Sequence, residues 1–354
     1  MNSFFRSSVI SAILLLFTNC NSFSQQKVAL SSQIDSLLSV SSPKFNGTIL
    51  ISQKGKIIYS KAEGFADFDA KTPLKIDSQF KIMSNTRQIT AVLILQEVEK
   101  GRIDLNAPIK KYLPNLKQSW ADSVTVHQLL NHTHGIVDPQ KPLLFKPGSQ
   151  FKYGNEGYPF LGQIIEAVSK KTYEEMASSL FKKLKMTNTF CYSKENSKYV
   201  VTSYMNDNNK IEKAQNSFTP EKIPSYGIIS TVNDLNIWNN NLHHGKILKP
   251  ETYKLMLQYN IMAQHNVFGK EKVGYGYGLR IVDKESPKYI GHTGLGDGFC
   301  SVNLYFPESD LSLIVLENQM NTNSDFFYNT AIKIKALILK SDLTDKNNSQ
   351  NGKK

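Results

Sequence analysis

Segments that favour β-strands lie at both ends of this 354-residue chain, and segments that favour helices fill its middle. Near the N-terminus, residues 46–53 and 56–61 are rich in β-branched side chains and flank Lys54-Gly55, a pattern typical of a hairpin. Towards the C-terminus, strands joined by Pro- and Gly-bearing turns are predicted at 275–282, 288–291, 299–306 and 311–317. The simplest assembly is one antiparallel sheet built from both ends of the chain, with a helical insertion between them.

Apolar residues recur at helical spacing between these strands and beside them. The clearest case is 84–100, which is followed by Gly101, a residue suited to a helix C-cap. The predicted helices are 28–38, 84–100, 124–131, 161–169, 173–184, 231–242 and 325–339. The predicted fold belongs to the α/β class and is of the α+β type, an antiparallel sheet flanked by helices with a mainly helical subdomain.

The domain boundaries follow from this order of elements. Residues 25–340 are expected to form the folded domain, with a sheet lobe at 25–83 and 270–340 and a helical lobe at 84–269. The tail at 341–354 is polar and rich in lysine, so it is expected to be disordered. A binding site is expected in the cleft between the sheet and the helical lobe.

The first 24 residues indicate export. Arg6 precedes the apolar run 9–17, which is typical of a secretory signal and too short to span a bilayer. Ser22-Phe23-Ser24 offers small residues for cleavage before Gln25, and the alternative is a lipoprotein box in which Cys20 carries a lipid anchor. Either route predicts a periplasmic or secreted protein with no transmembrane segment after cleavage.

Composition disfavours several classes of partner. The net charge of +12 comes from 38 Lys and four Arg, but the lysines are scattered, so nucleic-acid binding is not expected. The sequence contains no P-loop and no GxGxxG, so no nucleotide cofactor is predicted. His127, His132 and His134 form a patch without HExxH or a carboxylate partner, which favours a structural role over a metal site. Cys191 and Cys300 are interpreted as two unpaired thiols.

Three short motifs carry candidate chemistry. Ser84 stands at the start of the strong helix, and Arg87 lies one turn further along the same face. The second motif is Tyr153-Gly154-Asn155, and the third is His292-Thr293-Gly294. Each alone has an ordinary explanation, since Ser84 could simply cap a helix and His-x-Gly is usually a loop.

In this order the motifs resemble those of the penicillin-binding/β-lactamase-like serine hydrolases. That family has Ser-x-x-Lys at a helix start, Tyr-x-Asn in a helical domain, and Lys-or-His-x-Gly on an edge strand. The stretches 93–114, 124–136 and 226–238 also resemble the corresponding family segments, so the likeness spans residues 47–339. His292 is similar to the class C-like branch, which contains β-lactamases, DD-peptidases, D-aminopeptidases and esterases.

The resemblance implies a β-lactamase/transpeptidase-like fold and an acyl-enzyme on a serine, without metal or cofactor. The substrate would be a small molecule or peptide, namely an ester, a β-lactam or a D-amino-acid peptide derived from peptidoglycan. The implied roles are nucleophile for Ser84, proton relay for Tyr153, substrate binding for Asn155, His292, Thr293 and Gly294, and an oxyanion hole from the backbone N–H groups of Ser84 and Leu295.

Arg87 departs from the family pattern, which has lysine at this position. A guanidinium stays charged and cannot accept the proton of Ser84. One interpretation is that Arg87 supports Tyr153, which then acts as the base. The other is a catalytically impaired binding or regulatory protein that keeps the cleft. Lys81 precedes the helix, so it is expected to point elsewhere rather than to replace the missing lysine.

Overall fold

The computed structural model describes residues 28–207, 210–263, 267–269 and 272–344. The predicted signal peptide at 1–24 and its Cys20 alternative lie outside the described residues. Among the residues that the model describes, no helix has both the length and the apolar character needed to cross a bilayer.

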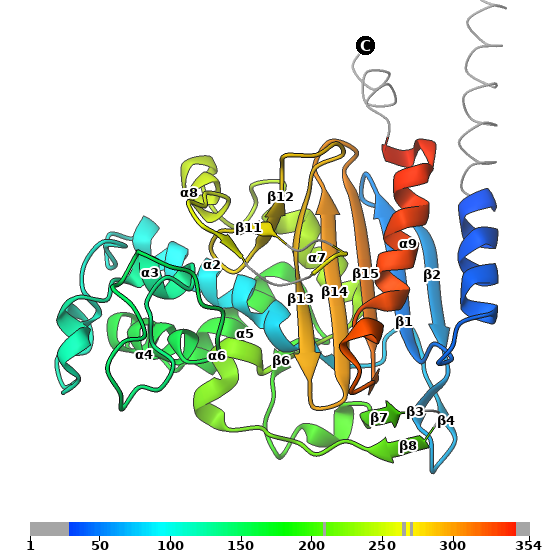
Figure 1. Ribbon diagram of the computed structural model, residues 1–354, viewed down its shortest axis with the longest axis horizontal. Coiled ribbons are helices and arrows are strands. Elements are labelled where there is room, and N and C mark those ends of the chain that lie inside the picture. The colour runs from blue at the N-terminus through cyan, green and yellow to red at the C-terminus, as the bar shows by residue number, and fades with distance from the viewer. Residues whose placement is uncertain (1–27, 208–209, 264–266, 270–271, 345–354) are drawn as a thin grey trace, which may run out of the picture.

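An eight-stranded sheet forms the centre of the molecule (Figure 1). All its neighbouring strands run antiparallel, in the order β10-β11-β12-β13-β14-β15-β1-β2. Its strands are β1 (Gly47–Gln53), β2 (Lys56–Glu63), β10 (Met262–Ala263), β11 (Val273–Tyr275), β12 (Arg280–Val282), β13 (Tyr289–Gly296), β14 (Phe299–Phe306) and β15 (Leu311–Glu317). Because β15 from the C-terminal part pairs with β1 from the N-terminal part, the prediction of one sheet built from both ends is confirmed.

The sheet buries both faces, because successive side chains along a strand point to opposite sides. On β15, Leu313 and Val315 belong to one apolar cluster, whereas Ile314 and Leu316 belong to another. The first cluster includes the N-terminal helix, whose described part is 28–39, and α9 (Asn329–Lys340). Figure 1 shows these two helices together on one side of the sheet and the helical lobe on the other.

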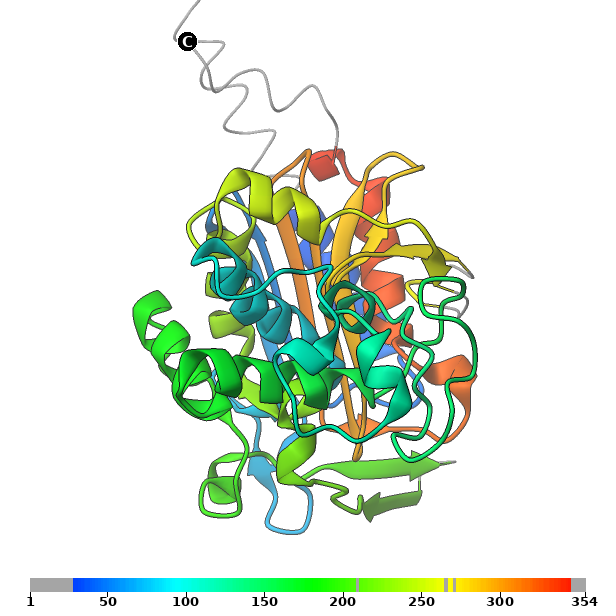
Figure 2. The same ribbon diagram turned by 90° about the vertical axis from the view of Figure 1, so that its left-hand side faces the viewer.

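The helical lobe covers the opposite face (Figure 2). Helix α2 (Thr86–Glu99) lies in its apolar interior, with Ile89, Val92 and Leu93 fully buried. The other helices of this part are α3 (Val126–Leu130), α4 (Gly157–Ser169), α5 (Tyr173–Leu184), α6 (Ile223–Tyr226), α7 (Val232–Leu242) and α8 (Pro250–Met256). The predicted fold class, an antiparallel sheet flanked by helices with a mainly helical subdomain, is confirmed.

The described residues also form three smaller sheets, and two of them join the predicted lobes. β9 (Ile228–Ser230) pairs with both β5 (Phe80–Lys81) and β6 (Phe190–Cys191). β7 (Tyr204–Asp207) pairs with β8 (Lys210–Lys213) and, in parallel, with β16 (Gln319–Met320). β3 (Phe65–Asp67) pairs with β4 (Thr72–Pro73). The pairs that β5 and β16 make with β9 and β7 therefore tie segments of the predicted sheet lobe to segments of the predicted helical lobe.

Several predicted boundaries need correction. The strand expected at 275–282 is two strands, β11 and β12, separated by a turn that contains Gly278 with a φ of 66°. β10 belongs to the main sheet although it falls within the predicted helical lobe, and α7 from the same lobe packs against β1 and β15. The tail does not begin at Ser341, because η7 (Asp342–Thr344) buries Leu343. Residues 345–354 of that predicted tail lie outside the described part.

Candidate active site

Ser84 lies on a short turn rather than within the helix. It is the middle residue of the 3-10 helix η1 (Met83–Asn85), and α2 begins two residues later at Thr86. Ser84 is partly exposed, whereas Met83 and Asn85 beside it are buried. Met83 has a φ of 49°, a left-handed conformation that residues with side chains rarely adopt. Such strained positions persist only where the surrounding structure holds them, and they cluster at functional sites.

A chain of buried hydrogen bonds holds this turn in place. The side-chain amide of Asn85 donates to Ser301 Oγ at 2.8 Å, and Ser301 donates to the carbonyl oxygen of Ile82 at 2.7 Å. On the other side, Gln88 Nε2 donates to Asn85 Oδ1 at 3.0 Å, and Trp238 Nε1 donates to Gln88 Oε1 at 2.8 Å. These satisfied polar groups tie the Ser84 turn to β14 and to α7, so the serine is positioned by both lobes.

The third motif reaches the Ser84 turn through a close backbone approach. A Cβ atom added at Gly294 would lie 2.3 Å from the carbonyl oxygen of Ile82 and 2.8 Å from Met83 Cβ. Only glycine permits this approach of β13. The pairing of β13 with β12 ends at Gly291, so the motif lies on a stretch of β13 that is paired with β14 alone. The structure therefore brings the first and third motifs together.

Arg87 joins the first motif to the second. Its side chain is fully buried, and its Nη1 donates a hydrogen bond to the hydroxyl oxygen of Tyr153. Its Nη2 donates to the carbonyl oxygen of Gly154 at 3.1 Å and to Asn155 Oδ1 at 2.6 Å. Among the described residues no carboxylate lies within ion-pair distance of Arg87, so its partners are neutral groups and its charge lies beside the Tyr153 oxygen.

Sequence reasoning missed a second buried guanidinium in the site. Arg280 on β12 is 2% exposed, and its Nε and Nη1 atoms have no hydrogen-bond partner among the described residues. Its guanidinium carbon lies 5.0 Å from the ring centroid of Tyr153, and that of Arg87 lies 4.6 Å away. The rarity of arginine was the available signal, because these are two of only four arginines beside 38 lysines. Two cations therefore flank the tyrosine ring.

His292 and Thr293 are buried in the sheet, at 0% and 2% exposure. His292 Nδ1 lies 2.6 Å from the carbonyl oxygen of Thr293, which can only accept, so this nitrogen carries a proton. His292 Nε2 lies 3.0 Å from the hydroxyl oxygen of Tyr275. These contacts indicate that His292 orients Tyr275 and the strand, which differs from the direct substrate contact expected from the motif.

The predicted histidine patch separates into different surroundings. His127 Nδ1 lies 2.6 Å from the hydroxyl of Tyr277, and His134 Nδ1 accepts from the backbone N–H of Ile136 at 2.9 Å. His132 is fully buried, with its ring centroid 4.6 Å from that of Tyr153. Burial, together with the charge of Arg87, lowers the pKa of His132 well below its ordinary value. His132 is therefore uncharged, and its ring packs against the ring of Tyr153.

Lys81 is held in a buried ion pair with Asp297. Its ammonium lies 3.0 Å from Asp297 Oδ2 and 2.6 Å from Asn216 Oδ1, and both side chains of this ion pair are almost fully buried. Burial lowers the pKa of Lys81, and Asp297 acts in the opposite direction. The ion pair links the turn between β13 and β14 to the loop at 214–218, so Lys81 is engaged in structure beside the site.

Comparison with known proteins identifies the same family as the three sequence motifs. A family profile described as Beta-lactamase matches residues 43–337. Protein flp of Staphylococcus aureus strain N315 is 26% identical over 298 residues, which cover 77% of this chain and 59% of that relative. Penicillin-binding protein 4* of Bacillus subtilis strain 168 is 23% identical over 317 residues, which cover 78% of this chain and 68% of that relative. The chain thus spans only part of these curated relatives.

Solved structures show the same fold. The octameric penicillin-binding protein homologue from Pyrococcus abyssi has a TM-score of 0.76 and 27% identity over 90% of this chain and 78% of that chain. D-amino acid amidase from Ochrobactrum anthropi SV3, complexed with D-phenylalanine, has a TM-score of 0.77 and 21% identity over 88% of this chain and 99% of that chain. With a profile match over most of its length and this fold, the chain belongs to the beta-lactamase family of serine hydrolases and penicillin-binding proteins.

Proposed function

We propose that this protein is an exported serine hydrolase that forms an acyl-enzyme through Ser84 on an ester or amide substrate. Ser84 Oγ attacks the carbonyl carbon and passes its proton to the Tyr153 oxygen, while Tyr153 passes its own O–H proton to the leaving alcohol or amine. In the second step water attacks the acyl-enzyme and gives a proton to Tyr153, while Tyr153 passes its O–H proton to Ser84 Oγ, which restores the serine and releases the acid.

The hydrogen bond from Arg87 to Tyr153 carries this proposal. Because the guanidinium has only donors, it occupies a lone pair of the tyrosine oxygen and directs the O–H proton elsewhere. Its positive charge also stabilises negative charge that develops on this oxygen, since no described carboxylate pairs with Arg87. Arg87 would therefore be a positioning residue, and Tyr153 would handle the proton.

Backbone N–H groups beside Ser84 would stabilise the oxyanion that forms when Ser84 attacks the substrate carbonyl. The first N–H groups of a helix have no partner within it, and Ser84 lies at such a start, in η1 directly before α2. The N–H group of Leu295 on β13 would supply the second donor, because Gly294 holds that strand against the turn.

The substrate class follows from the relatives by analogy. Solved neighbours include penicillin-binding proteins and a D-amino acid amidase complexed with D-phenylalanine. We therefore propose a D-amino-acid amide or peptide, a β-lactam or an ester as substrate, with peptidoglycan fragments as the natural source. The predicted signal at 1–24 supports the same compartment.

The test is intact-mass spectrometry after exposure to a fluorophosphonate and, separately, to a penicillin. The proposal expects a covalent adduct that Ser84→Ala abolishes and that the matched variant Ser179→Ala, exposed on α5, retains. Absence of any adduct on the wild-type protein would refute the acyl-enzyme and favour a catalytically impaired binding or regulatory protein.

A further inference from the structure

A second pocket lies on the face of the sheet away from the helical lobe. Its lining residues come from the N-terminal helix, the end of β15, β16 and the start of α9. Figure 1 shows the N-terminal helix and α9 on one side of the sheet. None of Ser84, Arg87 or Tyr153 lines it. Apolar side chains form much of the wall, namely Leu37, Leu38, Leu295, Met320 and Phe327.

One carboxylate lines this apolar pocket without a partner. Glu317 ends β15 on the same face as Leu313 and Val315, because side chains alternate along a strand. Within the described part of the chain, its carboxylate makes no hydrogen bond or ion pair, and Lys333 in the pocket wall does not come within ion-pair distance. Burial raises the pKa of Glu317 to about 8. An ionised carboxylate here needs a cation that these residues do not supply.

A second unpaired acceptor lines the same pocket. The side-chain nitrogen of Gln319 donates to the carbonyl oxygen of Lys44, so its oxygen is the atom that accepts from Asn206 Nδ2 at 3.0 Å. This arrangement orients the Asn206 amide and leaves its Oδ1 without a hydrogen-bond partner in the described part of the chain, although the residue is only 5% exposed. Buried amide oxygens are rarely left unsatisfied.

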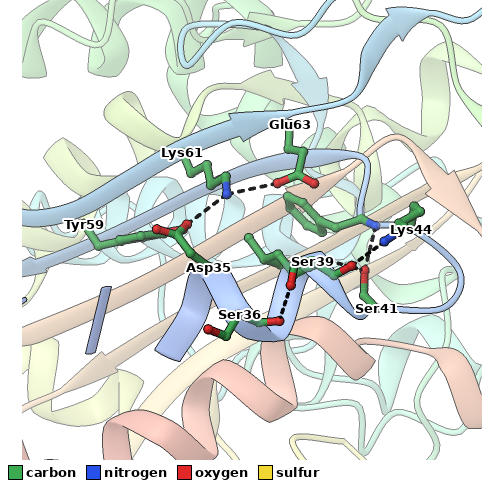
Figure 3. Close-up of polar contacts among 10 residues, drawn as sticks. Asp35, Ser36, Ser39, Ser41, Lys44, Tyr59, Lys61 and Glu63 are labelled. Atoms are coloured by element: carbon green, nitrogen blue, oxygen red, sulfur yellow. Dashed lines mark hydrogen bonds and ion pairs between the residues drawn. The ribbon is translucent and has the colours of Figure 1, made fainter. Parts of the chain in front are cut away.

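The N-terminal helix that forms one wall is anchored to the sheet (Figure 3). Asp35 accepts hydrogen bonds from Tyr59 at 2.9 Å and from Lys61 at 2.8 Å. At the end of this segment, the backbone N–H of Phe45 donates to Ser41 Oγ at 3.1 Å. These contacts hold the wall in place, so the pocket is part of the folded structure.

We infer that this pocket binds a small molecule that carries a protonated amine on an apolar body. An ammonium group has three donors and one positive charge, which matches a Glu317 carboxyl group that ionises when a cation pairs with it and an Asn206 amide oxygen that no described donor reaches. A neutral apolar ligand would leave both acceptors unsatisfied, and an anion would meet Glu317 with like charge. Lys333 is exposed, so solvent screens its charge.

Calorimetry with three probes of equal size tests this inference on the purified protein. We expect n-pentylamine to bind with one site and about tenfold more tightly than 1-pentanol, and pentanoate to bind more weakly than either. Glu317→Gln should weaken pentylamine binding about tenfold. The matched variant Glu251→Gln, exposed on α8, should bind as the wild type does.

Methyl NMR locates the site independently of any variant. Pentylamine should shift the methyl signals of Leu37 on the N-terminal helix and Leu295 on β13, which both line the pocket. Equal affinity for pentanol and pentylamine would overturn the inference, and so would unchanged amine affinity in Glu317→Gln. Methyl shifts confined to residues outside the pocket would overturn it as well. The outcome is independent of the serine adduct.

Discussion

The guanidinium of Arg87 donates a hydrogen bond to the hydroxyl oxygen of Tyr153 and lies against the face of its ring, with 4.6 Å between the guanidinium carbon and the ring centroid. The contact connects a helix residue to a loop that follows it by more than sixty positions. Under the proposed function, this contact would let a residue that cannot accept a proton assist proton transfer, because it would hold and polarise Tyr153.

Arg87→Lys should reduce the rate of fluorophosphonate labelling at Ser84. A lysine ammonium cannot reproduce the guanidinium contacts with Tyr153, Gly154 and Asn155 together. Loss of one charged hydrogen bond amounts to about 1.5–3 kcal/mol, or roughly a ten- to hundredfold slower reaction.

The control is Arg102→Lys, a conservative change at a side chain that is 43% exposed and pairs with Glu97. Its labelling rate should match that of the wild type. A faster reaction in Arg87→Lys would instead identify a decayed site that regains its base when lysine is restored.

Gly294→Ala should lower both stability and labelling. The added methyl group would meet the carbonyl oxygen of Ile82 and Ser301 Oγ at less than 2.5 Å, so β13 must move away from the Ser84 turn. Overpacking of this kind costs about 1–3 kcal/mol. Urea unfolding measures the loss, with Gly154→Ala as the stability control because nothing lies within 4 Å of its added methyl. Equal unfolding midpoints for both variants would contradict the close approach.

Stability should fall as the pH is lowered from 6.5 towards 4. Burial lowers the pKa of His134 to about 4, below its ordinary value of 6.5, so between these values only the unfolded chain takes up the proton. The folded state then loses about 1.4 kcal/mol per pH unit for such a histidine. His134→Asn should flatten this slope in urea unfolding at pH 7, 6 and 5. A slope identical to that of the wild type would contradict the neutral, buried state of His134.

Glu317→Gln should stabilise the protein at pH 7.5. Burial raises the pKa of Glu317 from 4.5 to about 8, so as the pH rises through this window the unfolded state loses the proton first and gains stability relative to the folded state. A neutral amide removes this penalty, with an expected gain on the order of 1 kcal/mol because the side chain is partly exposed. The gain should vanish at pH 4.5 in thermal or urea unfolding. A loss of stability at pH 7.5 would show that the carboxylate has a partner in the folded state.

The sequence predicted correctly the bounds of those strands and helices whose ends are set by residues close to them in the chain. β14 and β15 have the predicted bounds, since runs of β-branched, aromatic and aliphatic residues bounded by turn residues such as Gly298 and Pro307 are visible in the local sequence. Helix α5 also has its predicted bounds, because Thr172 and Glu175 form a capping box at its start. The sequence located the residues of the three motifs, but it did not predict which of them contact one another.

Other features depended on contacts that the sequence does not encode locally. The predicted helix at 84–100 begins at Thr86 instead, because hydrogen bonds from Ser301 and Asn85 hold the preceding residues in a separate turn. Arg280 carries no local signal for its place beside Tyr153, since β12 reaches the site only through pairing with β13.

The sequence by itself determined the fold class, the order of the strands and helices, and the residue types available for chemistry, because these follow from short-range periodicity and composition. Tertiary structure alone decided that Arg87 contacts Tyr153, that Gly294 packs against the Ser84 turn, and that Glu317 lines a pocket in which no described residue pairs with it. Each of these relationships joins residues that are distant in the chain, so only the packing of sheet against helices defines them.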